Sequence, residues 1–188
     1  MYAQLLKNFD IDAIVIGEGE ITCAELIPAL LKERSLKKIK GIAFKEKTKI
    51  IKTDARQLIF NLDEMPFPEH EIFATSNRTR FCFLSSRGCP NNCSFCCLDF
   101  FGRRVFRQRS VDNILAEIKY LIKAYPKLDT IEFSDDTFTL NPNRVIEFCN
   151  LVIAERIKLK FVCSGRIKPA SREMFAAMEA AGFIQIRF

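Results

Sequence analysis

The second half of the chain alternates between short apolar runs and amphipathic helical segments, and this rhythm limits the folds that are open to it. Apolar runs of strand length occupy residues 81–86, 130–134, 160–164 and 183–188, and helical patterns between them occupy residues 110–125, 142–156 and 170–181. Strands that are separated by helices usually pair in parallel, because the helix carries the chain back to the starting end of the sheet. The sequence therefore predicts an α/β fold with a parallel sheet, as a partial (β/α) barrel or a doubly wound sheet.

The predicted helices of this half carry recognisable start and stop signals. Ser110 and Asn141 stand where a side chain can accept a hydrogen bond from the first helical turn, and Pro142 suits the first helical position. Gly182 follows the last predicted helix and suits the left-handed conformation that ends many helices. These signals agree with the periodicity and support the alternation of strands and helices.

The N-terminal part is predicted to begin with a strand over residues 12–16, which a glycine turn connects to a helix. Thr22 and Glu25 have the spacing of a capping box, so we expect the helix to begin at Thr22. Residues 39–54 contain two apolar runs around a polar turn and predict a β-hairpin. One α/β unit of this kind does not close a core, and we therefore expect the tail of a larger domain.

Proline and charged residues between these two parts indicate a domain boundary. The segment 61–70 contains two prolines and several acidic residues, a composition typical of an extended linker. We expect three parts: residues 1–56, a linker over residues 57–77, and a barrel-like part over residues 78–188. His70, the only histidine of the chain, lies in the linker, and we expect it to be solvated.

The composition favours a cytoplasmic protein over a secreted one. Eight cysteines are compatible with a disulfide framework, but the first residues lack the basic and apolar regions of a signal peptide. No apolar stretch approaches the roughly 20 residues that span a bilayer. The formal charge of +6 permits an anionic partner without requiring nucleic acid. We expect a reducing compartment and cysteines that bind a metal.

Three cysteines stand in the spacing C-x3-C-x2-C directly after the first strand of the predicted parallel sheet. They are Cys89, Cys93 and Cys96. Three thiolates on one loop can hold three irons of a cubic [4Fe–4S] cluster and leave the fourth iron open to another ligand. Structural zinc usually takes four protein ligands, often from two paired turns, and the sequence has no second Cys-x2-Cys pair. The spacing therefore favours an iron–sulfur cluster over zinc.

Polar residues also follow the next two predicted strands at the point where each strand ends. Ser134, Asp135 and Asp136 follow the second strand, and Ser164 and Arg166 follow the third. The carboxyl ends of the strands form the functional edge of a (β/α) barrel, so we expect these residues to surround the cysteine loop. The two aspartates can instead shape a turn, and Arg166 can instead form a structural ion pair.

The other cysteines and a run of arginines have plainer interpretations. Five cysteines are expected to pack as small side chains: Cys23, Cys82, Cys97, Cys149 and Cys163. Four arginines follow the cysteine loop: Arg103, Arg104, Arg107 and Arg109. Such a run is usually a solvated face, although it also suits an anionic substrate or nucleic acid. Nucleic acid is the weaker alternative, because aromatic residues do not alternate with the arginines beyond Phe106.

The cysteine spacing, the strand before it and the alternating elements after it resemble the radical SAM superfamily. This resemblance implies that Cys89, Cys93 and Cys96 ligate the cluster, and that the amino and carboxylate groups of S-adenosylmethionine bind its open iron. One-electron reduction then cleaves the sulfonium and yields a 5′-deoxyadenosyl radical. Phe95 matches the aromatic residue that packs beside the cluster and the adenine.

The resemblance also implies a site for S-adenosylmethionine at the ends of the next two strands. Members usually carry a Gly-Gly-Glu-like segment for the methionyl amino group, whereas this chain has Ser134-Asp135-Asp136 and so departs from the pattern. An acidic group can still accept a hydrogen bond from the ammonium. Arg166 is placed to pair with the carboxylate, and Ser164 is placed to assist it.

The N-terminal part is similar to the class of this superfamily in which a Rossmann-like cobalamin-binding domain precedes the barrel. Gly17, Glu18 and Gly19 correspond to the sheet edge beside the nucleotide tail of cobalamin, where glycine permits close backbone approach. Residues 1–56 then correspond to the C-terminal remnant of that domain, and residues 78–188 to the first part of the barrel. We expect a fragment that is truncated at both ends, with cobalamin as a candidate third cofactor.

We predict a radical SAM enzyme that starts radical chemistry on an unidentified organic substrate, with cobalamin-dependent methyl transfer as the candidate reaction. No side chain is assigned a catalytic role. The resemblance implies a low-potential electron donor, a flavodoxin or a ferredoxin. Two alternatives stay open: an RNA-modifying methylthiotransferase, which the arginine run favours, and a non-catalytic fragment that binds zinc or a cluster. A truncated chain can also bind a cluster without turning over alone.

Overall fold

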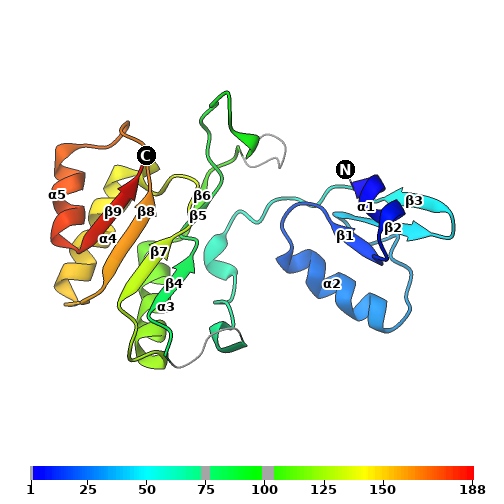
Figure 1. Ribbon diagram of the computed structural model, residues 1–188, viewed down its shortest axis with the longest axis horizontal. Helices are drawn as coiled ribbons and strands as arrows, with labels where there is room; N and C mark the ends of the chain where they lie inside the picture. The colour runs from blue at the N-terminus through cyan, green and yellow to red at the C-terminus, as the bar shows by residue number, and fades with distance from the viewer. Residues whose placement is uncertain (1, 73–76, 99–103) are drawn as a thin grey trace. The chain divides into compact units, whose positions relative to one another are not determined.

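A computed structural model describes residues 2–72, 77–98 and 104–188. It divides the chain into two units, Met1–Phe60 and Asn61–Phe188 (Figure 1). The division falls inside the predicted linker over residues 57–77, whose bounds stay a prediction; residues 73–76 of that linker and Arg103 of the arginine run lie outside the described residues. Within the described ranges, no helix has the length and apolarity that a membrane crossing requires.

The first unit is built on a three-stranded antiparallel sheet. Its strands are β1 (Ala13–Val15), β2 (Ile42–Glu46) and β3 (Lys49–Lys52), in that spatial order, and its helices are α1 (Tyr2–Asn8) and α2 (Glu20–Leu31). The predicted hairpin is confirmed by the pairing of β2 with β3, and Lys47 adopts a left-handed φ of 55° in its turn. Leu26 of α2 packs in one buried cluster with Ile42 and Phe44 of β2.

The start of α2 differs from the predicted capping box. The helix begins at Glu20, and Gly19 occupies the N-cap position. Thr22 is fully buried within the first turn, where its Oγ1 donates to the carbonyl oxygen of Glu18 at 3.3 Å. The predicted helix start at Thr22 is therefore wrong, because this hydroxyl bonds back to the preceding turn.

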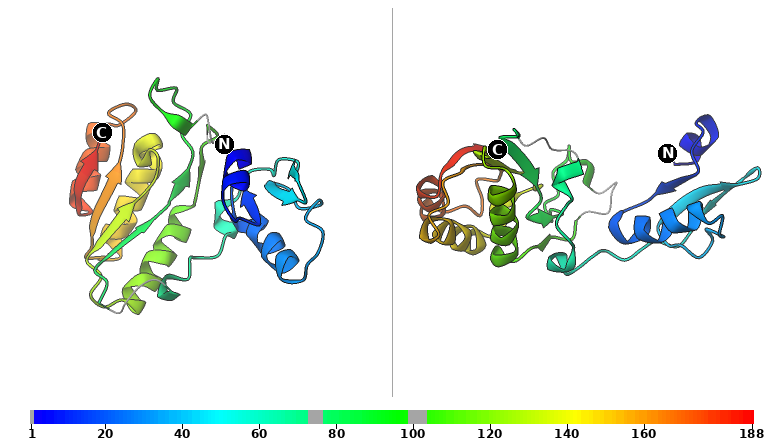
Figure 2. Two further views of the ribbon diagram at one scale, coloured as in Figure 1. Left: turned by 45° about the vertical axis from the view of Figure 1, so that its right-hand side comes forward. Right: turned by 90° about the horizontal axis from the view of Figure 1, so that it is seen from below.

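The second unit contains a four-stranded sheet in which all neighbouring strands are parallel. Its strands are β4 (Arg80–Phe83), β7 (Thr130–Phe133), β8 (Lys160–Ser164) and β9 (Phe183–Arg187), and the helices between them are α3 (Val111–Ala124), α4 (Pro142–Ala154) and α5 (Arg172–Ala180). All three helices lie on one face of the sheet (Figures 1 and 2). The predicted alternation of strands and helices is confirmed.

The spatial order of this sheet decides between the two predicted architectures. The order β4-β7-β8-β9 repeats the order along the chain, so each new strand is added at the same edge. A doubly wound sheet reverses its direction once and carries helices on both faces. Sequential parallel strands with helices on one face are instead the arrangement of a partial (β/α) barrel.

The helix boundaries follow the capping signals. The side chains of Ser110, Asn141 and Ser171 each accept a hydrogen bond from the backbone N–H three residues later, at the starts of α3, α4 and α5. Gly182 ends the last helical segment with a φ of 95°, a region that favours glycine. The predicted caps at Ser110 and Asn141 are confirmed.

The core of the second unit lies between the sheet and its three helices and is rich in phenylalanine. Phe81, Ile131 and Phe161 occupy paired positions on neighbouring strands, and all three are buried. The ring of Phe133 stacks on that of Phe138 with 4.4 Å between centroids. Each such side chain contributes about 1.5–3 kcal/mol through burial, so this face fixes the sheet on its helices.

Shorter elements complete the second unit. A two-stranded antiparallel ladder pairs β5 with β6; two 3-10 turns precede β4, and another follows β7. Their bounds are β5 (Ser86–Arg87), β6 (Arg107–Gln108), η1 (Leu62–Glu64), η2 (His70–Ile72) and η4 (Phe138–Leu140). The ladder was not predicted, because each of its strands has only two residues, too few to show the alternation of apolar and polar residues that marks a strand.

His70 is buried, contrary to the expectation of a solvated linker residue. Its side chain is 9% exposed, and Nε2 lies 3.1 Å from Oε1 of Glu117, which is fully buried on α3. The other oxygen of Glu117 accepts from Arg109, and the ring of His70 meets Phe81 edge-on at 5.2 Å. The expectation failed because the partners come from elements that are distant in sequence.

We expect His70→Leu to destabilise the second unit, because it leaves one oxygen of buried Glu117 without its partner. The expected loss in the free energy of unfolding is about 1–3 kcal/mol. His70→Gln is the matched control, since its amide can donate to the same oxygen, and we expect it to lose less than half as much. Urea unfolding followed by circular dichroism measures both variants. Equal losses in both would contradict the hydrogen-bond argument.

Candidate functional site

Three polar segments meet at the carboxyl-terminal edge of the parallel sheet. The backbone N–H of Ser134, just after β7, donates to the carbonyl oxygen of Phe83 at the end of β4 at 3.0 Å. The N–H of Gly165, just after β8, donates to the carbonyl oxygen of Arg187 in β9 at 2.8 Å. The cysteine loop leaves β4 at this same edge. Parallel pairing therefore brings together segments that are distant in sequence, such as Cys93 and Arg166, which are 73 residues apart.

The cysteine loop is fixed to the segment after β7 immediately before its first cysteine. Gly88 has a φ of 84°, which favours glycine, and its N–H donates to Oδ2 of Asp136 at 3.1 Å. Further along the loop, the N–H of Cys96 donates to the carbonyl oxygen of Cys93 at 3.0 Å. The first bond positions Cys89, and the second folds the other two cysteines into one tight turn.

Cys89 is the most enclosed of the three loop cysteines. Its Sγ lies 3.2 Å from Nδ2 of Asn91, which donates to it, and 3.4 Å from Oγ1 of Thr137. Burial alone raises the pKa of this thiol, but its hydrogen bonds with Thr137 and Asn91 together outweigh burial and lower the pKa. The surroundings of Cys89 therefore favour the thiolate, the form that binds metal.

Arg166 reaches the same loop from the end of β8. Its guanidinium donates to Sγ of Cys93 at 3.2 Å. Its backbone N–H donates to Oγ1 of the buried Thr139 at 2.8 Å, and the same hydroxyl donates to its carbonyl oxygen at 3.3 Å. A Cβ atom at Gly165 would lie 2.8 Å from Thr139, so glycine is needed for this close approach. Arg166 thus presents a fixed positive charge to the cysteine loop.

The other predicted site residues of this edge differ in exposure. Ser134 and Asp136 are exposed, Ser164 is half-buried, and the ring of Phe95 is 91% exposed. Asp135 is only 3% exposed, and both of its oxygens accept hydrogen bonds from protein groups. The structure therefore leaves Ser134, Asp136 and Ser164 open to a ligand, whereas it turns Asp135 inward.

Three side chains that hold this edge together received no role from the sequence: Asn91, Thr137 and Thr139. Thr137 directly follows the predicted Ser134-Asp135-Asp136 segment, so its position in the same polar run was the available signal. Asn91 lies between two of the loop cysteines. Thr139 carried no such signal, because its role depends on the contact with Arg166 across two strands.

The remaining cysteines differ in exposure, and Cys23 is half-buried. Cys149 and Cys163 are fully buried, and burial raises the pKa of each thiol to about 12. Both are therefore packed side chains, as predicted. Cys82 and Cys97 are exposed, so the expectation that they pack inside is wrong. Burial and Glu132 nonetheless raise the pKa of Cys82.

The donor set of the loop fits a metal cluster that thiolates bind. Within the described ranges, no three histidine, cysteine or acidic side chains already converge on one metal position. The three cysteines nonetheless lie on one loop, and Asn91 and Arg166 donate hydrogen bonds to the sulfurs of Cys89 and Cys93. Donors of this kind stabilise thiolates and tune clusters bound by them, whereas hard cations prefer oxygen.

The predicted glycine turn of the first unit connects β1 to α2. Gly17 has a φ of 97°, and no atom lies within 4 Å of the place that a Cβ would occupy. Oε2 of Glu18 accepts from the N–H of Ile59 at 2.7 Å, so this carboxylate has a structural partner. The backbone of Gly17 is thus open to close approach by another group.

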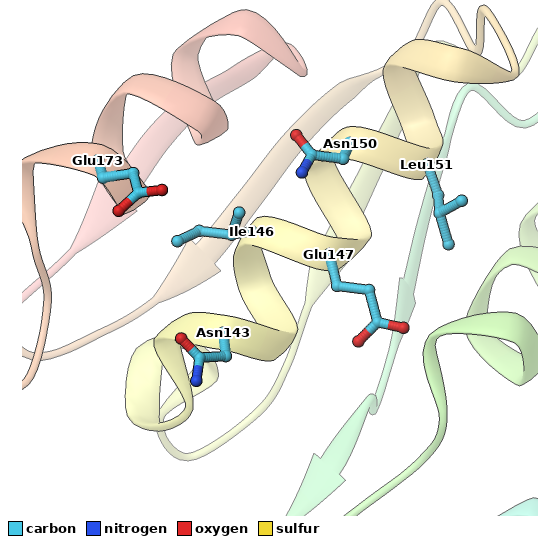
Figure 3. A pocket seen from close by; sticks show the side chains of 6 residues that line it. All are labelled: Asn143, Ile146, Glu147, Asn150, Leu151 and Glu173. Atoms are coloured by element: carbon cyan, nitrogen blue, oxygen red, sulfur yellow. The ribbon is translucent and has the colours of Figure 1, made fainter.

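A hollow of about 500 Å³ lies on the helical face of the second unit (Figure 3). It is lined by Asn143, Ile146, Glu147, Asn150, Leu151 and Glu173. These residues belong to α4 and α5, whereas the predicted site residues follow the strands. The hollow is therefore separate from the edge that carries the cysteine loop.

The fold and this edge define a class of protein. A cysteine loop after the first strand of a partial (β/α) barrel, with polar groups from the next two strands around it, is the arrangement of a barrel that binds a metal cluster. The chain belongs to the radical SAM superfamily, whose family model matches residues 83–188. Members of this superfamily are enzymes that use a [4Fe–4S] cluster and S-adenosylmethionine, and they require a reductant and a substrate.

Relatives extend the similarity into the first unit. An uncharacterized methyltransferase of Pyrococcus horikoshii is 36% identical over 184 residues, which cover 95% of this chain and 40% of the relative. An anaerobic magnesium-protoporphyrin IX monomethyl ester cyclase of Synechocystis is 32% identical over 176 residues, which cover 90% of this chain and 34% of the relative. The chain thus spans about two fifths of the first relative and about one third of the second.

A solved structure has the same fold. The cobalamin-dependent S-adenosylmethionine radical enzyme OxsB, with aqua-cobalamin and S-adenosylmethionine bound, superposes with a TM-score of 0.80 at 24% identity. The match covers 98% of this chain and 28% of that one. Both units of this chain therefore have counterparts in a single solved protein.

We expect the cysteines to differ sharply in their reaction with iodoacetamide in the native protein without a cluster. A thiol with a pKa of about 12, such as Cys149 or Cys163, holds only about one part in ten thousand as thiolate near pH 8, and burial also blocks access to it. Mass spectrometry should find Cys93 and Cys97 modified and the two buried thiols intact. All four should react in denaturant. Early modification of Cys163 would contradict the packing described above.

Proposed function

We propose that this chain carries the cluster-binding and S-adenosylmethionine-binding part of a cobalamin-dependent radical SAM enzyme that transfers a methyl group to an unactivated carbon. The main support is the junction at the carboxyl-terminal edge, where Arg166 of one strand end and Thr137 of another both contact cysteines of the loop. Superfamily membership and the name of the methyltransferase relative support the chemistry.

In this proposal Cys89, Cys93 and Cys96 are the three cluster ligands. All three lie within eight consecutive residues of the loop after β4. The hydrogen bonds around Cys89 favour its thiolate form. Cys97 is exposed and adjacent to Cys96, so one short turn cannot direct both side chains to the same cluster corner. The fourth corner is left for the methionyl group of S-adenosylmethionine.

The proposed S-adenosylmethionine site uses groups that stay open at the edge. Arg166 carries the positive charge that the methionyl carboxylate needs, and Ser164 lies on the same strand end. Ser134 and Asp136 are the exposed acceptors for the methionyl ammonium. The exposed ring of Phe95 offers a flat apolar surface to the adenine.

The chain's residues bind and orient in this proposal, while the cofactors supply the reactivity. When bound, the cluster would supply the electron for the cleavage of S-adenosylmethionine into methionine and a 5′-deoxyadenosyl radical. Arg166 and Asp136 hold the methionyl group in line for that cleavage. The electron comes from a low-potential flavodoxin or ferredoxin, and thiolate ligands suit the reducing cytoplasm, where we place the protein.

Cobalamin is the proposed third cofactor. The support is the open backbone at Gly17, together with the aqua-cobalamin bound in the OxsB structure. A turn between a strand and a helix is a common place for a nucleotide-like group to approach the backbone. We assign this role to Gly17 and Gly19, and we assign Glu18 to holding the turn through Ile59.

We expect anaerobic reconstitution to load the chain with about four irons and four sulfides, as a cubic cluster requires. Replacing Cys89, Cys93 or Cys96 by alanine should abolish most of this loading, because each removes one thiolate ligand. Cys97→Ala is the matched control and should keep the cluster. Iron and sulfide assays and the electron paramagnetic resonance spectrum of the reduced protein measure the outcome.

The same samples test the reaction when S-adenosylmethionine and dithionite are added. Release of 5′-deoxyadenosine by the native chain and by Cys97→Ala, but not by the three ligand variants, is the expected result. Stoichiometric zinc without sulfide, or full loading of Cys96→Ala, would contradict the proposed ligand set.

We expect hydroxocobalamin to bind through the turn after β1. Gly17→Val should weaken this binding by about tenfold or more, because a β-branched side chain both opposes a φ of 97° and fills the open space. Gly19→Ala changes the same turn with little strain and should bind nearly as tightly as the native chain, since its Cβ meets only Sγ of Cys23 at an ordinary 3.7 Å. Absorption titration measures the affinity, and circular dichroism checks the fold. Native affinity in the Gly17→Val variant would show that Gly17 is not part of the cobalamin site.

A further inference from the structure

The cluster loop, defined as residues 86–108, leaves the second unit and returns to it at almost the same point. Its described parts are residues 86–98 and 104–108. The β5–β6 ladder pairs Ser86 with Gln108 and Arg87 with Arg107, and the N–H of Arg109 donates to the carbonyl oxygen of Ser85 at 2.9 Å. The position of the loop thus depends on what holds residues 85 and 109.

Asp135 holds the outgoing end of the cluster loop from beneath. Its Oδ1 accepts from the N–H of Ser85 at 2.7 Å, and its Oδ2 accepts from the hydroxyls of Ser85 and Ser86, both at 2.6 Å. Both serines are buried and the carboxylate is 3% exposed, so no ligand can reach it from the open edge. These contacts all serve the chain that enters the loop.

Arg144 holds both ends of the loop at once. From α4 its Nη2 donates to the carbonyl oxygen of Ser85 at 2.8 Å, and its Nε donates to that of Arg109 at 3.2 Å. The side chain is 5% exposed, and its guanidinium lies 5.9 Å from the centre of the Phe138 ring. One rigid fork therefore fixes the outgoing and the returning strand together.

The two charges balance each other in this buried place. Burial raises the pKa of Asp135 and lowers that of Arg144, while the charge of each residue opposes the shift of the other. The two side chains do not bond each other: Asp135 accepts from the N–H and hydroxyl of Ser85, and Arg144 donates to the carbonyl oxygen of the same residue. Burying charges in this way is a poor way to gain stability, since apolar side chains of the same size often stabilise as well or better. Asp135 and Arg144 instead fix the orientation of the loop ends, through hydrogen bonds to backbone and hydroxyl groups.

We propose that Asp135 and Arg144 are positioning residues that clamp both ends of the cluster loop and so set where its three cysteine thiols lie against β7 and β8. The proposal rests on the proposed function, in which those thiols bind the cluster. It gives Asp135 a different role from its neighbour Asp136, which stays exposed toward S-adenosylmethionine. Residues of this kind, which orient metal ligands without touching the metal, commonly change metal affinity by about 10- to 100-fold.

The test compares variants of the clamp with a control elsewhere in the same unit. Asp135→Asn keeps the size but removes the charge, Arg144→Met removes the fork, and Ser86→Ala removes a single hydroxyl donor. Asp129→Asn is the matched control, because Asp129 lies at the opposite end of β7 and its carboxylate forms an exposed pair with Lys160. Circular dichroism and thermal unfolding confirm that each variant folds, and Ser86→Ala serves if the stronger changes unfold the chain.

Each folded variant is reconstituted anaerobically, and two properties of its cluster are measured without S-adenosylmethionine. We expect iron loss to an added chelator to be about 10- to 100-fold faster in Asp135→Asn and Arg144→Met, with a smaller increase in the same direction for Ser86→Ala. The electron paramagnetic resonance signal of the reduced cluster should broaden in parallel. Asp129→Asn should match the native chain in both measurements.

Several outcomes would overturn the clamp. Folded Asp135→Asn and Arg144→Met with native iron loss and native spectra would show that the cysteines find their places without it. Asp135→Asn could also show native iron loss and a native spectrum until S-adenosylmethionine is added. If its spectrum then failed to shift as the native spectrum does, Asp135 would be a ligand-binding residue instead. If the native chain and Asp129→Asn also hold no cluster, the proposed function fails, and the clamp fails with it.

Discussion

The parallel pairing of β4, β7 and β8 is the interaction on which the second unit depends. Its register places Phe81 beside Ile131, and Ile131 beside Phe161, on the face that the helices cover. A slip of one residue would turn these side chains to the other face. The same slip would also move the ends of the strands, where Thr137 and Arg166 contact Cys89 and Cys93 of the cluster loop. Burial of the core and alignment of the site therefore have one cause.

Two buried groups of charges meet at the base of the cluster loop, and Arg109 belongs to both. Its carbonyl oxygen accepts from Arg144, while its guanidinium donates to Glu117, which also pairs with His70. Buried charges are costly unless each has a partner. Because they share Arg109, the segment before β4, helix α3 and the loop base form one connected network.

The sequence predicted the elements better than it predicted the contacts between them. Periodicity and caps located the strands and helices, because those signals are local. The inward turn of Asp135 was also present in the pattern, since it continues the alternation of buried Ile131 and Phe133. Likewise Arg144 lies in phase with buried Phe148 and Val152 along α4. A charged residue in phase with an apolar stripe indicates a buried side chain that has hydrogen-bond partners. Which groups are the partners depends on the tertiary fold and cannot be read from the sequence.

The closure of the cluster loop at its base has a consequence for how such a chain can diversify. Lengthening a flexible loop costs only about 0.6 kcal/mol for each doubling when its two ends are already held together. In the proposed function the spacing from Cys89 to Cys96 is set by the corners of a cluster, whereas the number of residues that follow Cys96 is not. A related chain with more residues between Cys96 and Gln108 can therefore keep the pairing of Ser86 with Gln108, and with it the core register, at little cost.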